Sequence, residues 1–301
     1  ACFTIGGTLS VSGSLVVKNC YNNGVGDRAH GGCLNASDLV LQEGLLGLEN
    51  CKTSGHGAGA SLGTLLQRGG ELNFSECDAQ MDGGGLNARS LDMEGGLLNF
   101  KTCVAQGGGG ARLETLHQRA GKASFIQCAA RGEGGGLAAR RLMQEGAMRF
   151  EDSFAGHGGG AHVTDLITSG NLSFEGCRAQ TGGGGGGYAR RLTQSESGQL
   201  ICRNCASSVA APRGSVLRTR GPDLSQLQRL EIQGAQGIAL DGDAMNISEL
   251  ALGPSEVPFR LKARSLFLDS ANCSAMEECT FQLHKQAEHH RIDKERRWVS
   301  G

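Results

Sequence analysis

The sequence predicts an all-β fold, a single-stranded right-handed parallel β-helix with about 24–26 residues per coil. Phenylalanine recurs at spacings of 26, 25, 25 and 24 residues. Around each one, apolar and polar residues alternate, which is typical of strands. A glycine cluster follows at the same phase and suits tight turns. Helical repeats are longer, and no leucine-rich frame recurs. The phenylalanines are Phe74, Phe100, Phe125, Phe150 and Phe174.

Each repeat follows the frame G-x-x-x-F-x-x-C-x-A, then the glycine cluster and a leucine. Equivalent residues of stacked coils lie about 4.8 Å apart, so they should form ladders. Burying one Phe or Leu is worth about 1.5–3 kcal/mol, and a single coil cannot offset its ordering entropy without neighbours. Besides the phenylalanines, the predicted ladders are Cys51, Cys77, Cys103, Cys128 and Cys177, with Ser153 replacing one cysteine, and Leu91, Leu116, Leu142, Leu166 and Leu192.

The frame predicts one domain over residues 1–284, followed by a charged C-terminal tail at 285–301. Regular coils are expected over about 13–215, with an inserted loop between Cys20 and Leu34. Residues 216–284 still alternate apolar and polar residues and should form irregular coils. In the last glycine cluster, Gly187 falls where other repeats carry Leu or Ala, which predicts a local gap in that coil.

Twelve cysteines leave three interpretations open. Buried free thiols are favoured, because parallel Cβ vectors in stacked coils are awkward for bonding. Disulfides are the second interpretation, with Cys202–Cys205 and Cys273–Cys279 as the local candidates. Metal binding is the third, but Cys202-x-x-Cys205 is only half of a zinc pattern.

The glycine clusters do not resemble nucleotide loops. A phosphate loop occurs once, between a strand and a helix, with GK[ST] or a ribose-binding acid, and neither accompanies any cluster, including Gly182–Gly187. The eight histidines share no phase, and the acids are scattered. No cofactor, metal site or catalytic group is therefore predicted. A net charge of -1 favours neither nucleic acid nor anionic membrane, and no apolar run could span a bilayer.

Five arginines form the candidate binding face: Arg89, Arg140, Arg141, Arg190 and Arg191. They alternate along the coils with acids or hydroxyl residues, which avoids like charges at about 4.8 Å. Two interpretations follow. The residues form either a solvated face with ion pairs between coils or a weakly basic stripe for acidic glycans.

Phe74-x-x-Cys77 with Gly84-Gly85-Leu86 resembles the repeat of the polymorphic outer membrane protein family, whose motifs are FxxN and GGA followed by an aliphatic residue. The resemblance covers roughly residues 10–215, with Cys in place of Asn. The Cys-rich form is similar to surface β-helix proteins of protists. The resemblance implies a pectin-lyase-like right-handed β-helix at the cell surface, often adhesive, without catalytic residues.

Together these features predict a non-catalytic structural or adhesive module that presents an extended face to a glycan or a cell-surface protein. It is expected outside the cell or on its surface, as part of a longer chain. A polysaccharide-active enzyme of the pectate-lyase type is the first alternative, and a purely mechanical spacer is the second.

Overall fold

The computed structural model describes the backbone of residues 1–24, 30–181, 183–195, 198–207, 215–219, 225–233, 238–252, 260–272, 280–283, 290–292 and 298–300. Side chains are described for the residues of these ranges up to residue 207, and at 218, 230–233, 247, 250 and 251. All regular structure in these ranges is β-strand.

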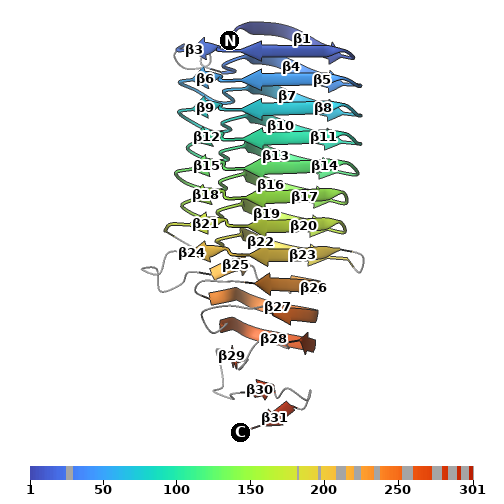
Figure 1. Cartoon of the computed structure of the whole chain (residues 1–301), viewed down its shortest axis with the longest axis vertical. Coiled ribbons are helices and arrows are strands. Elements are labelled where there is room, and N and C mark those ends of the chain that lie inside the picture. Colours follow the sequence, from blue (N-terminus) through green and yellow to red (C-terminus); the bar gives the residue numbers. More distant parts are fainter. Residues whose placement is uncertain are drawn as a thin grey trace.

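The chain is a parallel β-helix of about eight coils, as the repeat predicts (Figure 1). Each coil contributes a long, a medium and a short strand, and each strand pairs in parallel with its equivalents in the coils above and below. The long strands are β1 (Phe3–Val11), β4 (Leu34–Leu41), β7 (Ala60–Gln67), β10 (Leu86–Met93), β13 (Ala111–Gln118), β16 (Leu137–Gln144), β19 (Ala161–Thr168) and β22 (Gly187–Gln194). The medium strands are β2 (Ser14–Lys18), β5 (Leu45–Glu49), β8 (Glu71–Ser75), β11 (Leu97–Lys101), β14 (Lys122–Ile126), β17 (Ala147–Glu151), β20 (Asn171–Glu175) and β23 (Gln199–Arg203). The short strands are β3 (Tyr21–Asn22), β6 (Lys52–Thr53), β9 (Asp78–Ala79), β12 (Val104–Ala105), β15 (Ala129–Ala130), β18 (Phe154–Ala155), β21 (Arg178–Ala179) and β24 (Ala206–Ser207).

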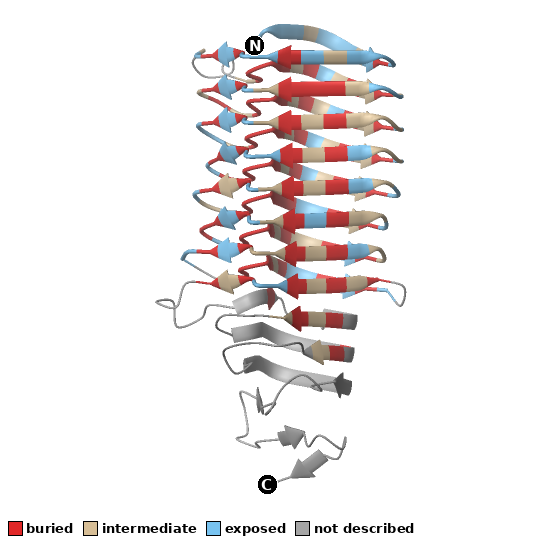
Figure 2. Cartoon of the chain, in the orientation of Figure 1, coloured by how far each residue is buried: buried red, intermediate tan, exposed pale blue. Residues whose placement is uncertain are grey.

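The core consists of ladders of identical side chains. Buried positions recur at the same places in successive coils (Figure 2). Phe74 stacks on Phe100 with ring centroids 4.7 Å apart, and this stacking continues through Phe125 and Phe150 to Phe174. The leucines at 91, 116, 142, 166 and 192 are buried and paired in register on the long strands.

Glycine is required in each cluster for two different reasons. Gly83 has a φ of +67°, which L side chains rarely adopt. Gly85 lies against the phenylalanine ladder, where a Cβ would be only 2.6 Å from Cδ1 of Phe100. The phenylalanine and the glycine that faces it therefore form one packing unit.

The residue before each cysteine position has a left-handed backbone conformation. This conformation turns the chain into the short strand. Glu76 and Thr102 have φ values of 53° and 54°, and the equivalent residues of other coils behave alike. After this corner, Cys77 is buried and its thiol donates to the carbonyl of Ser75, at 3.4 Å. Ser153 donates in the same way to Glu151, at 3.2 Å, which explains why serine replaces cysteine there. The residues with this left-handed conformation are Asn19, Asn50, Glu76, Thr102, Gln127, Asp152, Gly176 and Asn204.

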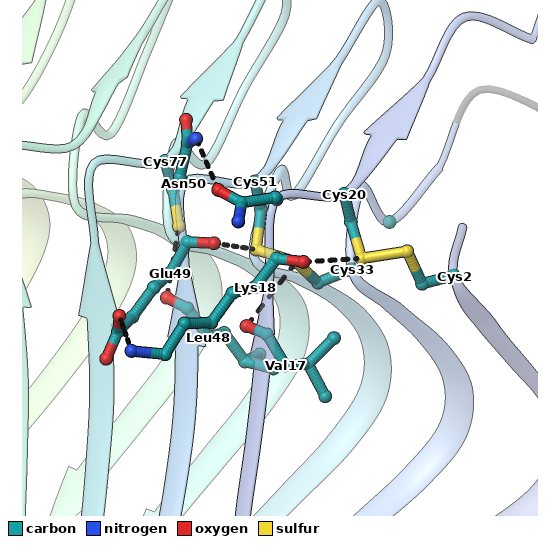
Figure 3. Close-up of a disulfide and its surroundings, with 12 residues drawn as sticks. Cys2, Val17, Lys18, Cys20, Cys33, Leu48, Glu49, Asn50, Cys51 and Cys77 are labelled. Atoms are coloured by element: carbon teal, nitrogen blue, oxygen red, sulfur yellow. Dashed lines mark hydrogen bonds and ion pairs between the residues drawn. A yellow bond between two sulfur atoms is a disulfide. The ribbon is translucent and has the colours of Figure 1, made fainter.

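Two disulfides replace the phenylalanine–glycine unit in the first coils (Figure 3). Leu48 pairs in register with Phe74, and the smaller side chain leaves room for Cys33 where later coils have glycine. Cys33 bonds to Cys51 across the same coil, and Cys2 bonds to Cys20 in the coil before it.

The cysteine predictions therefore need correction. Cys51 belongs to the buried column but is oxidised. The Cys202–Cys205 bond, a candidate under the second interpretation, is wrong, because both thiols are free and buried, as the favoured interpretation predicts. Cys202 occupies the phenylalanine position and Cys205 the cysteine position, on either side of the left-handed corner at Asn204. Cys273 and Cys279 lie outside the described residues. The free thiols are Cys77, Cys103, Cys128, Cys177, Cys202 and Cys205, all buried.

Gly187 has the predicted register, opposite Ala161, but the predicted gap is wrong. A Cβ at Gly187 would lie 3.1 Å from Cζ of Phe174, so the phenylalanine ring already fills this space.

After the regular coils the three-strand pattern changes. The strands are β25 (Ser215–Thr219), β26 (Ser225–Gln233), β27 (Ile238–Leu252), β28 (Arg260–Asn272) and β29 (Thr280–Leu283). The long strand β27 pairs with both β25 and β26, so two faces of a coil merge into one continuous strand. Within 285–301, β30 (His290–Ile292) and β31 (Trp298–Ser300) pair antiparallel.

Candidate functional site: a charged groove on the long-strand sheet

A groove of about 560 Å³ crosses the long strands on the outside of the solenoid. Its floor includes Ala88 and Ala139, which are almost fully buried. Charged and polar side chains form its walls. The lining residues are His56, Asp82, Asn87, Ala88, Arg89, Arg112, Leu113, Glu114, Glu133, Ala138, Ala139, Arg140, His162 and Thr164.

One wall is a row of alternating charges, which we call the histidine wall: His56, Asp82, Arg112, Glu133 and His162. Arg112 lies between two carboxylates, with Nη1 4.0 Å from Asp82 Oδ1 and 3.9 Å from Glu133 Oε2. The Nδ1 atom of His162 is 3.5 Å from Glu133 Oε2. These partners come from successive coils, so the wall runs along the stack.

Both histidines of this wall favour the neutral form. The backbone N–H of Asp82 donates to Nδ1 of His56 at 3.2 Å, so Nδ1 is an acceptor and Nε2 carries the proton. Burial lowers the pKa of His56, against the opposing effect of the Asp82 carboxylate. Burial likewise lowers the pKa of His162, although Glu133 acts in the opposite direction. Near neutral pH the histidines therefore supply hydrogen bonds rather than charge.

A second set of lining residues belongs to the arginine column. The column consists of Arg89, Glu114, Arg140, Thr164 and Arg190, each the fourth residue of its long strand, and all but Arg190 line the groove. Neighbouring positions pair in register from β10 to β22, so these residues follow one another along the solenoid axis. Arg89, Arg140 and Arg190 are exposed, and none makes an ion pair or hydrogen bond in the described structure. The column therefore presents three guanidinium groups without an ion-pair partner, one at every second coil, with Glu114 between the first two.

The five predicted arginines divide between two columns. Arg89 and Arg140 line the groove, and Arg190 continues their column one coil beyond Thr164. Arg141 and Arg191 belong to the adjacent column, where Asp165 lies between them in register. Arg191 binds Asp165 at 2.6 Å, and its guanidinium lowers the pKa of that carboxyl group. The ion-pair interpretation therefore holds for Arg191, whereas Arg89, Arg140 and Arg190 are unpaired.

The histidine wall had no counterpart in the sequence analysis, because its residues come from two different places in the repeat. His56, Asp82 and Glu133 precede the glycine cluster, whereas Arg112 and His162 are the second residues of long strands. Aligning the repeats compares only equivalent positions, so it does not show that these two positions of neighbouring coils lie within reach of each other.

Three of the buried thiols, those of Cys128, Cys202 and Cys205, do not add a reactive centre to the groove. Burial raises the pKa of Cys128, Cys202 and Cys205, which keeps these thiols protonated and poorly nucleophilic. Among the described residues, no three His, Cys, Asp or Glu side chains are grouped to hold a metal ion.

No protein-family model, curated protein or solved structure matches this chain. The described residues include no helix long and apolar enough to cross a membrane.

Proposed function

We propose that this chain is a non-catalytic binding module that presents its long-strand face to an extended acidic glycan outside the cell. The arginine column supports this proposal most directly. Arg89, Arg140 and Arg190 form no side-chain ion pair on this exposed face, although Glu114 lies in the same column. Guanidinium groups bind carboxylate and sulfate oxygens through two parallel hydrogen bonds.

The lining of the groove favours a glycan over a protein partner. Protein interfaces are centred on buried aromatic or aliphatic anchors. Here the apolar lining residues are alanines and Leu113, and they belong to the buried floor. The walls instead offer many hydrogen-bonding groups, which suit the hydroxyl groups of a sugar chain.

An extracellular location is supported by the two disulfides, because such bonds persist in oxidising compartments and are rare in the cytosol. The resemblance to surface β-helix repeats supports the same location. The same resemblance implies adhesion, so the proposal includes an adhesive role.

Binding is tested with immobilised acidic and neutral glycans. Wild-type protein should bind acidic chains, with an affinity that falls as salt rises. The double variant Arg140→Gln/Arg190→Gln should bind at least tenfold more weakly. Arg178→Gln is the matched control, because Arg178 is exposed and unpaired on the short-strand sheet. Equal binding by all three proteins, or none by the wild type, would contradict the proposal and favour the spacer.

A polysaccharide-active enzyme is the second candidate. Asp82 and Glu133 both lie within 4.0 Å of Arg112 Nη1, so their oxygens are at most about 8 Å apart. Inverting glycosidases separate their two carboxyl groups by about 6.5–9.5 Å. However, Arg112 fills the space between the two, where a substrate would have to enter. Release of new reducing ends from uronic-acid polymers, abolished by Glu133→Gln, would establish the enzyme instead.

A further inference from the structure

We propose that the histidine wall makes the binding of acidic glycans depend on pH, because protonation of His56 and His162 changes the wall from net negative to net positive. This inference rests on the proposed glycan binding and adds its regulation. Its basis is the order of the charged groups along the wall and the contacts between them.

The wall is a symmetrical row of groups. Arg112 stands at its centre, Asp82 and Glu133 flank the arginine, and one histidine lies beyond each carboxylate. With both histidines neutral, two carboxylates face one guanidinium group, so the row carries one net negative charge. With both histidines protonated, the row carries one net positive charge. The wall therefore repels an acidic chain near neutral pH and attracts it in mild acid.

The other charged residues of the groove do not mask this change. They are Arg89, Glu114 and Arg140, which together contribute one net positive charge. The groove as a whole is therefore uncharged while the histidines are neutral, and it carries two net positive charges when both are protonated. Near neutral pH an acidic chain is held mainly by the arginine column, and in mild acid the histidine wall contributes as well.

Protonation also makes Arg112 available to a ligand. Its Nη1 atom shares Oε2 of Glu133 with Nδ1 of His162, at 3.9 Å and 3.5 Å. On the other side, Nδ1 of His56 lies 3.6 Å from Oδ2 of Asp82 and gives up the backbone hydrogen bond that it accepts when neutral. Once protonated, both histidines donate to the carboxylates and compete with Arg112 for them. The guanidinium group can then bind a carboxylate or sulfate group in the groove.

Burial determines where His162 takes up its proton. This histidine is faced by Glu133, Arg112, His157 and Tyr188, whose ring stacks on it with centroids 4.5 Å apart. Burial lowers the pKa of His162, and His157 and Arg112 act in the same direction, whereas Glu133 opposes them.

His56 has equivalent surroundings at the other end of the wall. It is faced by Asp82, Arg112 and His30, whose ring stacks on it with centroids 5.2 Å apart. Burial lowers the pKa of His56, and only Asp82 opposes this effect. Both histidines should therefore become charged below the ordinary value near 6.5, and a bound polyanion should raise the pKa of each by linkage.

The test measures the affinity for heparin oligosaccharides, because their sulfate groups stay ionised throughout. Titration calorimetry is carried out at about pH 7.5 and about pH 5, where carboxyl groups with ordinary pKa values near 4 are still mostly ionised. Salt at about 0.15 M screens charges that lie beyond about 8 Å of the ligand. Wild-type protein should bind at least fivefold more tightly at the lower pH.

The double variant His56→Gln/His162→Gln should lose this gain, so that its two affinities differ less than twofold. His117→Gln is the matched control, because His117 also lies close to a carboxylate, 3.4 Å from that of Glu145, but is not among the lining residues of the groove. This variant should keep the fivefold gain. Thermal unfolding at both pH values establishes that each variant is folded.

NMR titration of the ring protons of His56 and His162 is an independent measurement. Heparin should move the midpoints of both titrations to higher pH, and unchanged midpoints would overturn the switch. The switch would also be overturned by equal wild-type affinities at the two pH values, by a gain that the double variant keeps, or by a gain that His117→Gln loses. Each of these results leaves acidic-glycan binding intact, whereas a wild type that binds at neither pH would overturn the proposed function itself.

Discussion

A new disulfide can be predicted from the way the chain fills its core. At Gly186 an added Cβ would lie 3.3 Å from Sγ of Cys205, within reach of a bond. The coil resembles the one bridged by Cys33 and Cys51, because it has Cys202 rather than phenylalanine at the position of Leu48. We expect Gly186→Cys to oxidise with Cys205 and to staple the coil across its core.

The expected gain in the free energy of unfolding follows from the length of the loop that the new bond closes. Residues 186 and 205 are 19 apart, against 18 for each native bridge. Closing a loop of this size removes unfolded-state entropy worth about 3 kcal/mol. The added Cβ also approaches Cβ of Phe174 at 3.1 Å, which requires a small shift. A net stabilisation of about 2 kcal/mol is therefore expected in the oxidised form.

Denaturant unfolding of the oxidised variant and of the wild type, with both native disulfides intact in each, measures this difference, and peptide mass mapping identifies the bond. Gly85→Cys is the matched control, because its Cβ would lie 2.6 Å from Cδ1 of Phe100. That variant should be destabilised and should not bond to Cys103. If the cysteine at 186 pairs with Cys177 or Cys202, or if both variants bridge equally well, the packing argument is refuted.

Three further substitutions test the core and the groove. Phe100→Ala should cost about 3–5 kcal/mol in unfolding free energy, because it removes a buried ring from the middle of a stack; a cost below about 1 kcal/mol would contradict the ladder. Gly187→Ala should change that free energy by less than about 1 kcal/mol, since the tight contact with Phe174 offsets the lower entropy of the unfolded chain. Because burial lowers the pKa of His162, the unfolded chain binds this proton more readily. The free energy of unfolding should therefore be highest above the pKa of the unfolded state, near 6.5, and should fall as the pH drops through the pKa of the folded state. His162→Gln should reduce this loss in denaturant titrations between about pH 7.5 and about pH 5, and an unchanged pH dependence would count against the assignment.

The fold could be predicted because the repeat itself carries the register. Once Phe74 and Phe100 are aligned, the remaining strand residues of the two coils are aligned as well, and the parallel β-helix follows. The left-handed residue before each cysteine position was missed, although Asn, Asp or Gly, which adopt this conformation most readily, occupy five of the eight corners. Glu76, Thr102 and Gln127 interrupt that pattern in three successive coils.

The disulfides join neither equivalent cysteines of neighbouring coils nor cysteines close in sequence, which are the pairs that a repeat makes visible. The bonds instead cross the core within one coil. A signal was present: Cys33 replaces a glycine in the same coil in which Leu48 replaces a phenylalanine. Similarly, the candidate arginines were found, but separating free Arg140 from paired Arg191 required the position of Asp165.

The left-handed corners also leave room to stabilise the protein without touching its core or its groove. A left-handed L residue costs roughly 1–2 kcal/mol, whereas glycine adopts this conformation freely. The chain already uses glycine once, at Gly176, but it keeps the β-branched and exposed Thr102 at an equivalent corner. Because each coil contacts only its neighbours, relief at several corners should add up along the stack. The solenoid is thus a scaffold whose thermal tolerance can be raised one coil at a time.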